Sequence, residues 1–207
     1  MKTDSDKTQS CQLVQLKHLV VDDIINFDPR REPDCSFNYV DISSIDNVEK
    51  RITQPKVTVG RLAPSRARQV IRANDVLVAT TRPNLNAVAL VPPSLDGAIC
   101  STGFCVLRCN SKILPQYLFL FVQSELFVSE MSDLVQGALY PAVTDRQVKA
   151  QYLPLVSIES QNRIIEDVAG QHAAIITTIA AIESQLAAAR RLPSAILRKH
   201  FPTATSS

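Results

Sequence analysis

The chain has 207 residues, which is enough for one domain with a hydrophobic core and an appended element. Hydrophobic residues make up 45% and charged residues 20% of it, a composition that excludes a largely disordered chain. The net charge of +2 neither indicates nor excludes a nucleic-acid partner, so the distribution of charge along the chain decides more.

Residues 1–10 are polar and lack an apolar period, which predicts a disordered tail. They also lack the apolar stretch of a signal peptide, and no unbroken apolar run reaches the ~20 residues that span a bilayer. The five cysteines are an odd number without a secretory context, which favours reduced thiols. We therefore expect a cytoplasmic protein without a membrane partner.

Residues 11–110 are predicted to be rich in β-strands. Short apolar stretches are separated by turn signals, with no segment of helix length between them: Tyr39–Ile42, Val57–Val59, Val76–Ala79, Ala87–Val91, Ala98–Cys100 and Phe104–Leu107. This pattern favours a twisted, partly closed sheet over a parallel α/β sheet. Cys100, Cys105 and Cys109 fit no paired zinc-ligand spacing, so they are interpreted as buried strand cysteines rather than a metal site.

Positive charge is concentrated in residues 50–82. Residues 1–49 carry five basic and ten acidic side chains, whereas residues 50–82 carry eight basic and one acidic, a net charge of +7. Six of the eight are arginines, whose guanidinium groups make bidentate contacts with phosphates and guanine edges. The segment is a candidate nucleic-acid surface, and the alternative is a solvated basic surface.

Residues 115–135 have a helical apolar period, with Pro115 at the start and Gly137 as the stop signal. Thr144 and Gln147 form a capping-box pattern that predicts a short helix. Tyr152–Val156 is predicted to be a strand at a sheet edge, because Pro154 cannot donate to a neighbouring strand.

Residues 158–192 are predicted to form a long dimerising helix, followed by a C-terminal tail over 193–207. Positions spaced alternately by three and four residues give a heptad seam typical of a coiled coil: Ile165, Val168, His172, Ile175, Ile179, Ile182, Leu186 and Ala189. Packing of this stripe into an ordinary core is the alternative. His172 is a polar seam residue, and we hypothesise that it fixes the register or direction of pairing.

The chain lacks the motifs of the enzymes that act on DNA. It has no glycine-rich phosphate loop, no Asn/Asp-Pro-Pro-aromatic motif of an adenine methyltransferase, and too few acidic residues in its basic segment for a two-metal nuclease centre. We therefore expect no catalytic residues, no metal and no cofactor.

An ordered series of segments resembles the target-recognition domain and following helix of type I restriction–modification specificity subunits. These segments are Gly60–Arg68, Asn74–Thr80, Arg82–Leu85, Ser101–Arg108, Gly137–Asp145, Leu153–Leu155 and Glu159–Ile164. The resemblance implies an α+β fold, with a β-rich target-recognition domain and packed helices over 11–157 and a coiled-coil helix over 158–192. Specificity subunits usually carry two such halves, and this chain is similar to one of them.

The resemblance implies a non-catalytic subunit that reads double-stranded DNA and directs an adenine methyltransferase, and in some systems a translocating restriction subunit, to a bipartite site. Pairing of the seam implies a homodimer reading a symmetric site. The methyltransferase is expected to dock near Ser157–Ile164 and Leu192–Phe201. The candidate DNA-binding residues are Arg61, Ser65, Arg66, Arg68, Arg72, Arg82, Asn84, Tyr140, Thr144 and Arg146.

Two other functions remain open on the sequence. The chain could be a coiled-coil adaptor or decoy that binds the methyltransferase without reading DNA. A free-standing RNA-binding protein is the third hypothesis, although aromatic residues are only 5% of the chain and leave few side chains for stacking on bases.

Overall fold

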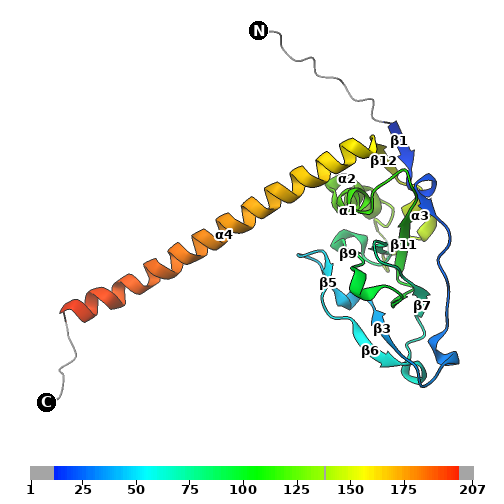
Figure 1. Cartoon of the computed structure of the whole chain (residues 1–207), viewed down its shortest axis with the longest axis horizontal. Coiled ribbons are helices and arrows are strands. Elements are labelled where there is room, and N and C mark those ends of the chain that lie inside the picture. Colours follow the sequence, from blue (N-terminus) through cyan, green and yellow to red (C-terminus); the bar gives the residue numbers. More distant parts are fainter. Residues whose placement is uncertain (1–11, 138, 201–207) are drawn as a thin grey trace, which may run out of the picture. The chain divides into compact units, whose positions relative to one another are not determined.

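The computed structural model describes residues 12–137 and 139–200, with side chains up to residue 192 (Figure 1). The predicted tail over 1–10 lies outside the described residues. The chain divides between Arg163 and Ile164 into two compact units, a β-rich domain and the remainder of a long helix.

The centre of the domain is a four-stranded antiparallel sheet. Its order is β2 (Val20–Val21), β11 (Phe104–Cys109), β8 (Val76–Ala79) and β9 (Val88–Leu90). All four residues of β8 are buried, because the sheet is covered on both faces. Leu118 and Val122 of α1 (Pro115–Gln123) and Phe127 of α2 (Glu125–Asp133) cover one face.

A second four-stranded sheet covers the other face. Its order is β6 (Lys56–Val59), β3 (Ser36–Val40), β10 (Ile99–Ser101) and β7 (Ala67–Val70), and only its β3–β10 pair is parallel. Val40 and Cys100 of this sheet pack in one cluster with Leu77 and Phe104 of the first. Figure 1 shows α1 and α2 on one side of β9 and β11, with β3 and β6 on the other.

Smaller elements complete the domain. Two short antiparallel pairs join β4 (Ile45–Asp46) to β5 (Arg51–Ile52) and β1 (Gln12–Gln15) to β12 (Tyr152–Leu155). A short helix, α3, covers Asp145–Lys149. Six 3-10 turns lie at Leu16–His18 (η1), Pro29–Arg31 (η2), Ile42–Ser44 (η3), Gly60–Leu62 (η4), Pro83–Leu85 (η5) and Pro93–Leu95 (η6). The α+β fold class predicted above is confirmed.

The predicted single helix over 115–135 is wrong, because the chain breaks it at Ser124. Ser124 is extended, with ψ 149°, and its hydroxyl accepts the Phe127 N–H at 3.3 Å. It therefore caps α2 instead of continuing α1. The two helices still pack together, since the rings of Phe121 and Phe127 meet edge to face with centroids 5.5 Å apart. The capping box of Thr144 and Gln147 is present as predicted.

Arg68, one of the candidate DNA-binding residues, belongs to strand β7. The alternating pattern of this strand is hidden by Gln69, a polar residue that points into the core. Its amide donates to the carbonyl oxygens of Ser101 at 3.0 Å and Phe104 at 2.9 Å. Burial of Gln69 is thus compensated by hydrogen bonds that only the folded chain supplies.

The predicted buried strand cysteines are confirmed for Cys100 on β10 and Cys105 on β11. Burial raises the pKa of both thiols, and it raises the pKa of Cys109 to about 12. These thiols therefore stay protonated, which makes them poor nucleophiles and poor metal ligands. Among the described residues, no group of three or more His, Cys, Asp or Glu side chains is arranged to hold a metal ion.

The long helix α4 runs over Ile158–His200 and begins inside the domain. Gln161 is fully buried there, and its side chain accepts the Leu114 N–H at 2.8 Å and donates to the carbonyls of Val156 at 2.9 Å and Lys112 at 3.1 Å. The first turn of α4 is thereby fixed to the domain. The backbone stays helical through Pro193, beyond residue 192 where we expected the helix to end.

The apolar stripe of α4 is exposed in the single chain. Ile175, Ile179 and Ile182 are 55%, 50% and 57% exposed. By length and composition alone, Ile158–Leu192 could also cross a membrane, because an 18-residue window within it has a mean hydropathy of 1.2. The sequence has no unbroken apolar run here, because scattered polar residues interrupt the alanines and isoleucines.

Candidate nucleic-acid interface

Four segments that are distant in sequence meet at one edge of the domain, and we name them the loop edge: Arg66, Thr102–Gly103, Thr80–Asn86 and Tyr140–Val143. The Arg66 carbonyl accepts the Thr102 N–H at 2.9 Å, and the Gly103 carbonyl accepts the Thr80 N–H at 2.8 Å. The Pro141 carbonyl accepts the Arg82 N–H at 2.9 Å. Backbone hydrogen bonds therefore bring the predicted residues Arg66, Arg82 and Tyr140 to the same edge.

The Arg82–Asn86 part of the loop edge has an unusual backbone. Arg82 has φ 51° and Asn86 has φ 46°, one at each end of η5. Left-handed conformations are uncommon for residues other than glycine, and they cluster at functional sites. Lys50 stabilises the turn, because its Nζ donates to the Asn86 carbonyl at 2.7 Å. The turn presents the exposed side chains of Arg82 and Asn84 from a fixed backbone.

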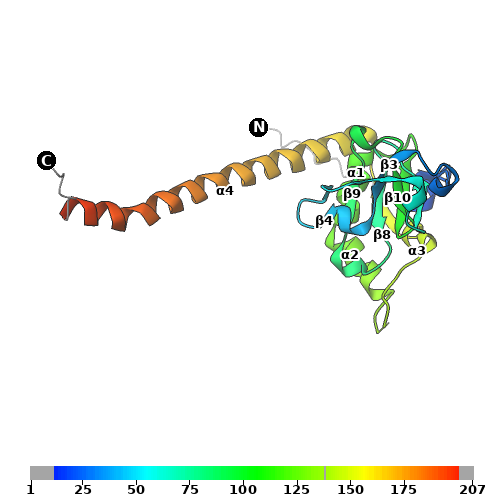
Figure 2. The same cartoon turned by 90° about the horizontal axis from the view of Figure 1, so that it is seen from below.

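The same edge carries two large exposed side chains. Leu139 and Tyr140 are each 86% exposed, in the connection between α2 and α3. Figure 2 shows this connection as a loop that extends away from the domain. Tyr140 is an exposed aromatic side chain on the same edge as Arg66 and Arg82, and such a side chain can contact a nucleic-acid surface.

Three of the predicted arginines already have acidic partners. Arg61 lies 2.5 Å from Asp34, Arg72 lies 2.9 Å from Asp23, and the Arg68 guanidinium lies 3.2 Å from Asp28. The first two pairs are exposed, so they contribute little to stability and can be exchanged for a phosphate. The net positive charge at these three positions is nevertheless smaller than the sequence indicated.

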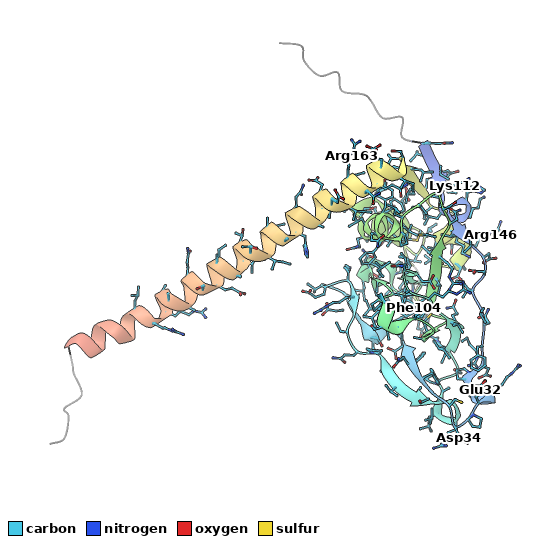
Figure 3. All side chains as sticks on the ribbon, in the orientation of Figure 1. Glu32, Asp34, Phe104, Lys112, Arg146 and Arg163 are labelled. Atoms are coloured by element: carbon cyan, nitrogen blue, oxygen red, sulfur yellow. The ribbon has the colours of Figure 1, made fainter. Side chains whose placement is uncertain are left out.

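Arg66, Arg82 and Arg146 are exposed, and within the part of the chain that the structure describes their side chains have no acidic partner. Ser65, the neighbour of Arg66, is exposed as well. Thr144 serves α3, because its hydroxyl accepts the Gln147 N–H at 3.3 Å. In Figure 3, Arg146 lies well apart from Asp34, the acidic partner of Arg61. The predicted residues therefore form more than one patch.

A buried ion pair supports the strand that leads to the loop edge. Asp75, which is 1% exposed, accepts Arg108 Nε at 2.9 Å and Nη2 at 2.8 Å, as well as the Arg72 N–H at 2.8 Å. Arg108 also donates to Asp23 Oδ1 at 2.7 Å. The hydrogen bonds that Arg108 donates to Asp75 raise the pKa of Arg108, so the guanidinium stays charged. The network joins β8, β11 and the segment after β2.

Sequence reasoning did not find the basic residues around Asp28. Residues 25–27 run beside β7, where the Phe27 N–H donates to the Arg68 carbonyl at 2.7 Å and the Val70 N–H to the Ile25 carbonyl at 2.9 Å. Arg31 is thereby brought close to Arg68. Residues 1–49 carry more acidic than basic side chains, and this net negative charge hid the site. The adjacent arginines Arg30 and Arg31 after Asp28 were the only local sign of a basic patch in this segment.

Two packed sheets with helices on one face, followed by a long helix that starts after the last strand, are the architecture of a target-recognition domain with its conserved helix. No family model matches the sequence. The chain is 25% identical over 132 residues to the type I restriction enzyme HindI specificity subunit of Haemophilus influenzae, covering 62% of this chain and 29% of that protein.

Solved structures extend the likeness to the whole chain. The HsdS subunit from Thermoanaerobacter tengcongensis matches with a TM-score of 0.86 and 36% identity, over 100% of this chain and 54% of that one. A structure described for the assembly and conformational transition of the type I restriction–modification system matches with a TM-score of 0.81 and 38% identity, over 95% of this chain and 51% of that one. The predicted resemblance to type I specificity subunits is confirmed, and the chain spans about half the length of these structures.

Proposed function

We propose that this chain is a non-catalytic DNA-reading subunit that directs a partner adenine methyltransferase to a bipartite site. The observation that carries the proposal is the loop edge, where Arg66, Arg82 and Tyr140 are exposed and the two arginines have no acidic partner among the described residues. Likeness to HsdS subunits over the whole chain supports the same function. In this proposal the arginines supply the salt-dependent attraction to phosphates, and the rigid turn at Arg82 presents side chains to base edges.

We further propose that α4 pairs with α4 of a second copy. Its seam side chains Ile175, Ile179 and Ile182 are half exposed in the single chain, and burial of the exposed half of each contributes roughly 1 kcal/mol. Polar side chains such as Gln171 and Glu183 lie elsewhere on the helix and suit water better than lipid. Pairing in the cytoplasm therefore fits α4 better than a membrane span, and a two-fold dimer would read a symmetric site.

The experiment that tests the reading function is a methylome. The chain is expressed with the adenine methyltransferase encoded nearest to it, in a host without adenine methylation, and methyladenine is mapped by long-read sequencing. A symmetric two-part motif with a fixed spacer is the expected result. An asymmetric motif would contradict homodimerisation, and a stable complex without methylation would favour the adaptor or decoy function.

Two double variants test whether the loop edge contacts DNA. Arg66→Ala with Arg82→Ala is expected to abolish methylation of the motif while the complex still assembles. The control is Arg190→Ala with Arg191→Ala, which removes the same charge from exposed residues of α4 that lie outside the loop edge, the seam and the expected docking segments. If both double variants changed methylation of the motif equally, the loop edge would not be the surface that contacts DNA.

The seam has a matched test as well. Ile175→Asp with Ile179→Asp is expected to give monomers in sedimentation, because four carboxylates would enter the pair interface. Thr177→Asp with Ser184→Asp adds the same charges at positions opposite the seam, and should leave the dimer intact. A dimer that survives the first pair of substitutions would show that another surface holds the copies together.

A further inference from the structure

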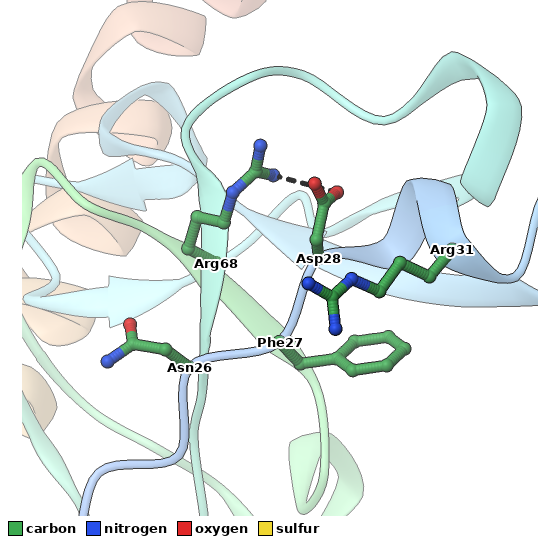
Figure 4. Close-up of a pocket in the computed structure, with 5 residues that line it drawn as sticks. All are labelled: Asn26, Phe27, Asp28, Arg31 and Arg68. Carbon is green, nitrogen blue, oxygen red and sulfur yellow. Dashed lines mark ion pairs between the residues drawn. The ribbon is translucent and has the colours of Figure 1, made fainter.

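A hollow of about 320 Å³ opens beside the start of β7. Its lining is Asn26, Phe27, Asp28, Arg31 and Arg68 (Figure 4). The residues come from two segments, which the hydrogen bond from Phe27 N–H to the Arg68 carbonyl holds side by side at 2.7 Å. The hollow is therefore formed by the fold and not by one flexible loop.

The carboxylate in the hollow is already neutralised. Asp28 accepts Arg30 Nε at 3.0 Å and Arg30 Nη2 at 2.8 Å, and it pairs with Arg68 Nη1 at 3.2 Å. The hydrogen bonds from Arg30 lower the pKa of Asp28 to about 2, so the carboxylate is charged at neutral pH. Its role is to orient the two guanidinium groups.

The remaining groups around the hollow are donors. Arg68 Nη1 is shared between Asp28 and the Ala67 carbonyl at 2.7 Å, which leaves Nε and Nη2 of Arg68 for a ligand. Arg31 is exposed and has no acidic partner among the residues described here. With Arg30 included, three guanidinium groups surround one carboxylate, and this excess of positive charge calls for an anion.

We propose that this hollow binds a phosphodiester group of the DNA backbone. Guanidinium groups donate in pairs to phosphate oxygens, and two of them, those of Arg31 and Arg68, line the hollow (Figure 4). Asn26 and Phe27 complete the lining. The inference rests on the proposed DNA-reading function and extends the interface from Arg66 along β7.

A phosphate fits this position better than a base edge. Base edges lie at the floor of a groove, so the side chains that read them must project from the protein. Arg68 instead lies within the hollow, with only 21% of its side chain exposed. Phosphates are the outermost groups of the duplex and can enter such a hollow. The contact would position the domain and carry no sequence information of its own.

The test measures DNA affinity of the complex with the methyltransferase, for Arg31→Ala and for Arg191→Ala, an exposed residue of α4, as the charge-matched control. Duplexes carrying the methylated motif and duplexes of random sequence are titrated by fluorescence anisotropy between 50 and 200 mM salt, a range that reveals phosphate contacts. Arg31→Ala is expected to weaken binding to both duplexes by the same factor. It should also reduce the slope of log affinity against log salt concentration by about 0.9. Between 50 and 200 mM salt, the variant should therefore lose about threefold less affinity than the wild type loses. Arg191→Ala should match the wild type.

Each other outcome overturns the assignment. Equal DNA affinity of the Arg31→Ala and Arg191→Ala complexes would show that the hollow is not part of the interface. Weaker binding to the motif alone would make Arg31 a residue that reads bases. Saturable binding of inorganic phosphate that depends on Arg31, together with unchanged DNA binding, would assign the hollow to a free anion. A wild-type complex that binds no DNA would instead refute the proposed function itself.

Discussion

Asp75→Ala tests whether the buried ion pair between β8 and β11 stabilises the domain. Asp75 has a side chain that is 2% exposed, and Arg108 one that is 11% exposed. The substitution removes the acceptor of two guanidinium N–H groups and of the Arg72 backbone N–H. A positive charge then stays in the core without its main partner.

Removal of one partner from a buried pair costs about 3–5 kcal/mol in the free energy of unfolding. Asp23 still contacts Arg108 at 2.7 Å, but its side chain is 48% exposed, so it compensates only in part. We therefore expect the lower half of that range, about 3–4 kcal/mol. With a urea dependence of about 2 kcal/mol per molar, the unfolding midpoint should fall by roughly 1.5–2 M.

Urea unfolding followed by circular dichroism measures this shift. Asp23→Ala is the control, because it removes a more exposed carboxylate from the same network and should therefore lower the unfolding midpoint much less than Asp75→Ala does. Asp75→Leu with Arg108→Met replaces the whole pair by apolar side chains and should be more stable than Asp75→Ala. The reasoning would be refuted by an Asp75→Ala protein as stable as Asp23→Ala.

Three further predictions concern the hollow and the start of α4. Gly60→Ala should cost about 1–3 kcal/mol, because the added Cβ would lie 2.1 Å from the Glu32 carbonyl oxygen; thermal unfolding measures it, and an unchanged midpoint would contradict the close approach. The carboxyl of Asp28 should titrate with a pKa of about 2 by NMR, so its stabilising effect is present above its unfolded-state pKa of about 3.9 and is lost as the pH falls through about 2. Arg30→Ala should raise that pKa, whereas no change would show that another group holds it down. Gln161→Leu should cost about 1–3 kcal/mol and speed amide exchange at Leu114, and slow exchange there would show that Gln161 does not anchor α4.

The parts of the fold that depend on local pattern were predictable from the sequence. The heptad spacing predicted α4, and the Thr144–Gln147 pattern predicted the N-terminus of α3, because a helix requires only residues within a few positions of one another. The apolar run at Val76–Ala79 likewise predicted β8. The ordered motifs also indicated the family that the structural likeness then confirmed.

The tertiary structure alone decided which charges are available. Arg61 and Arg66 lie five positions apart in the same basic segment, yet folding pairs Arg61 with Asp34 and leaves Arg66 without an acidic partner among the described residues. The hollow at Arg31 exists only because residues 25–27 lie along β7, a contact between segments some forty positions apart. Electrostatic partners are chosen by distance in space, and strand pairing sets that distance, so no local pattern could reveal them.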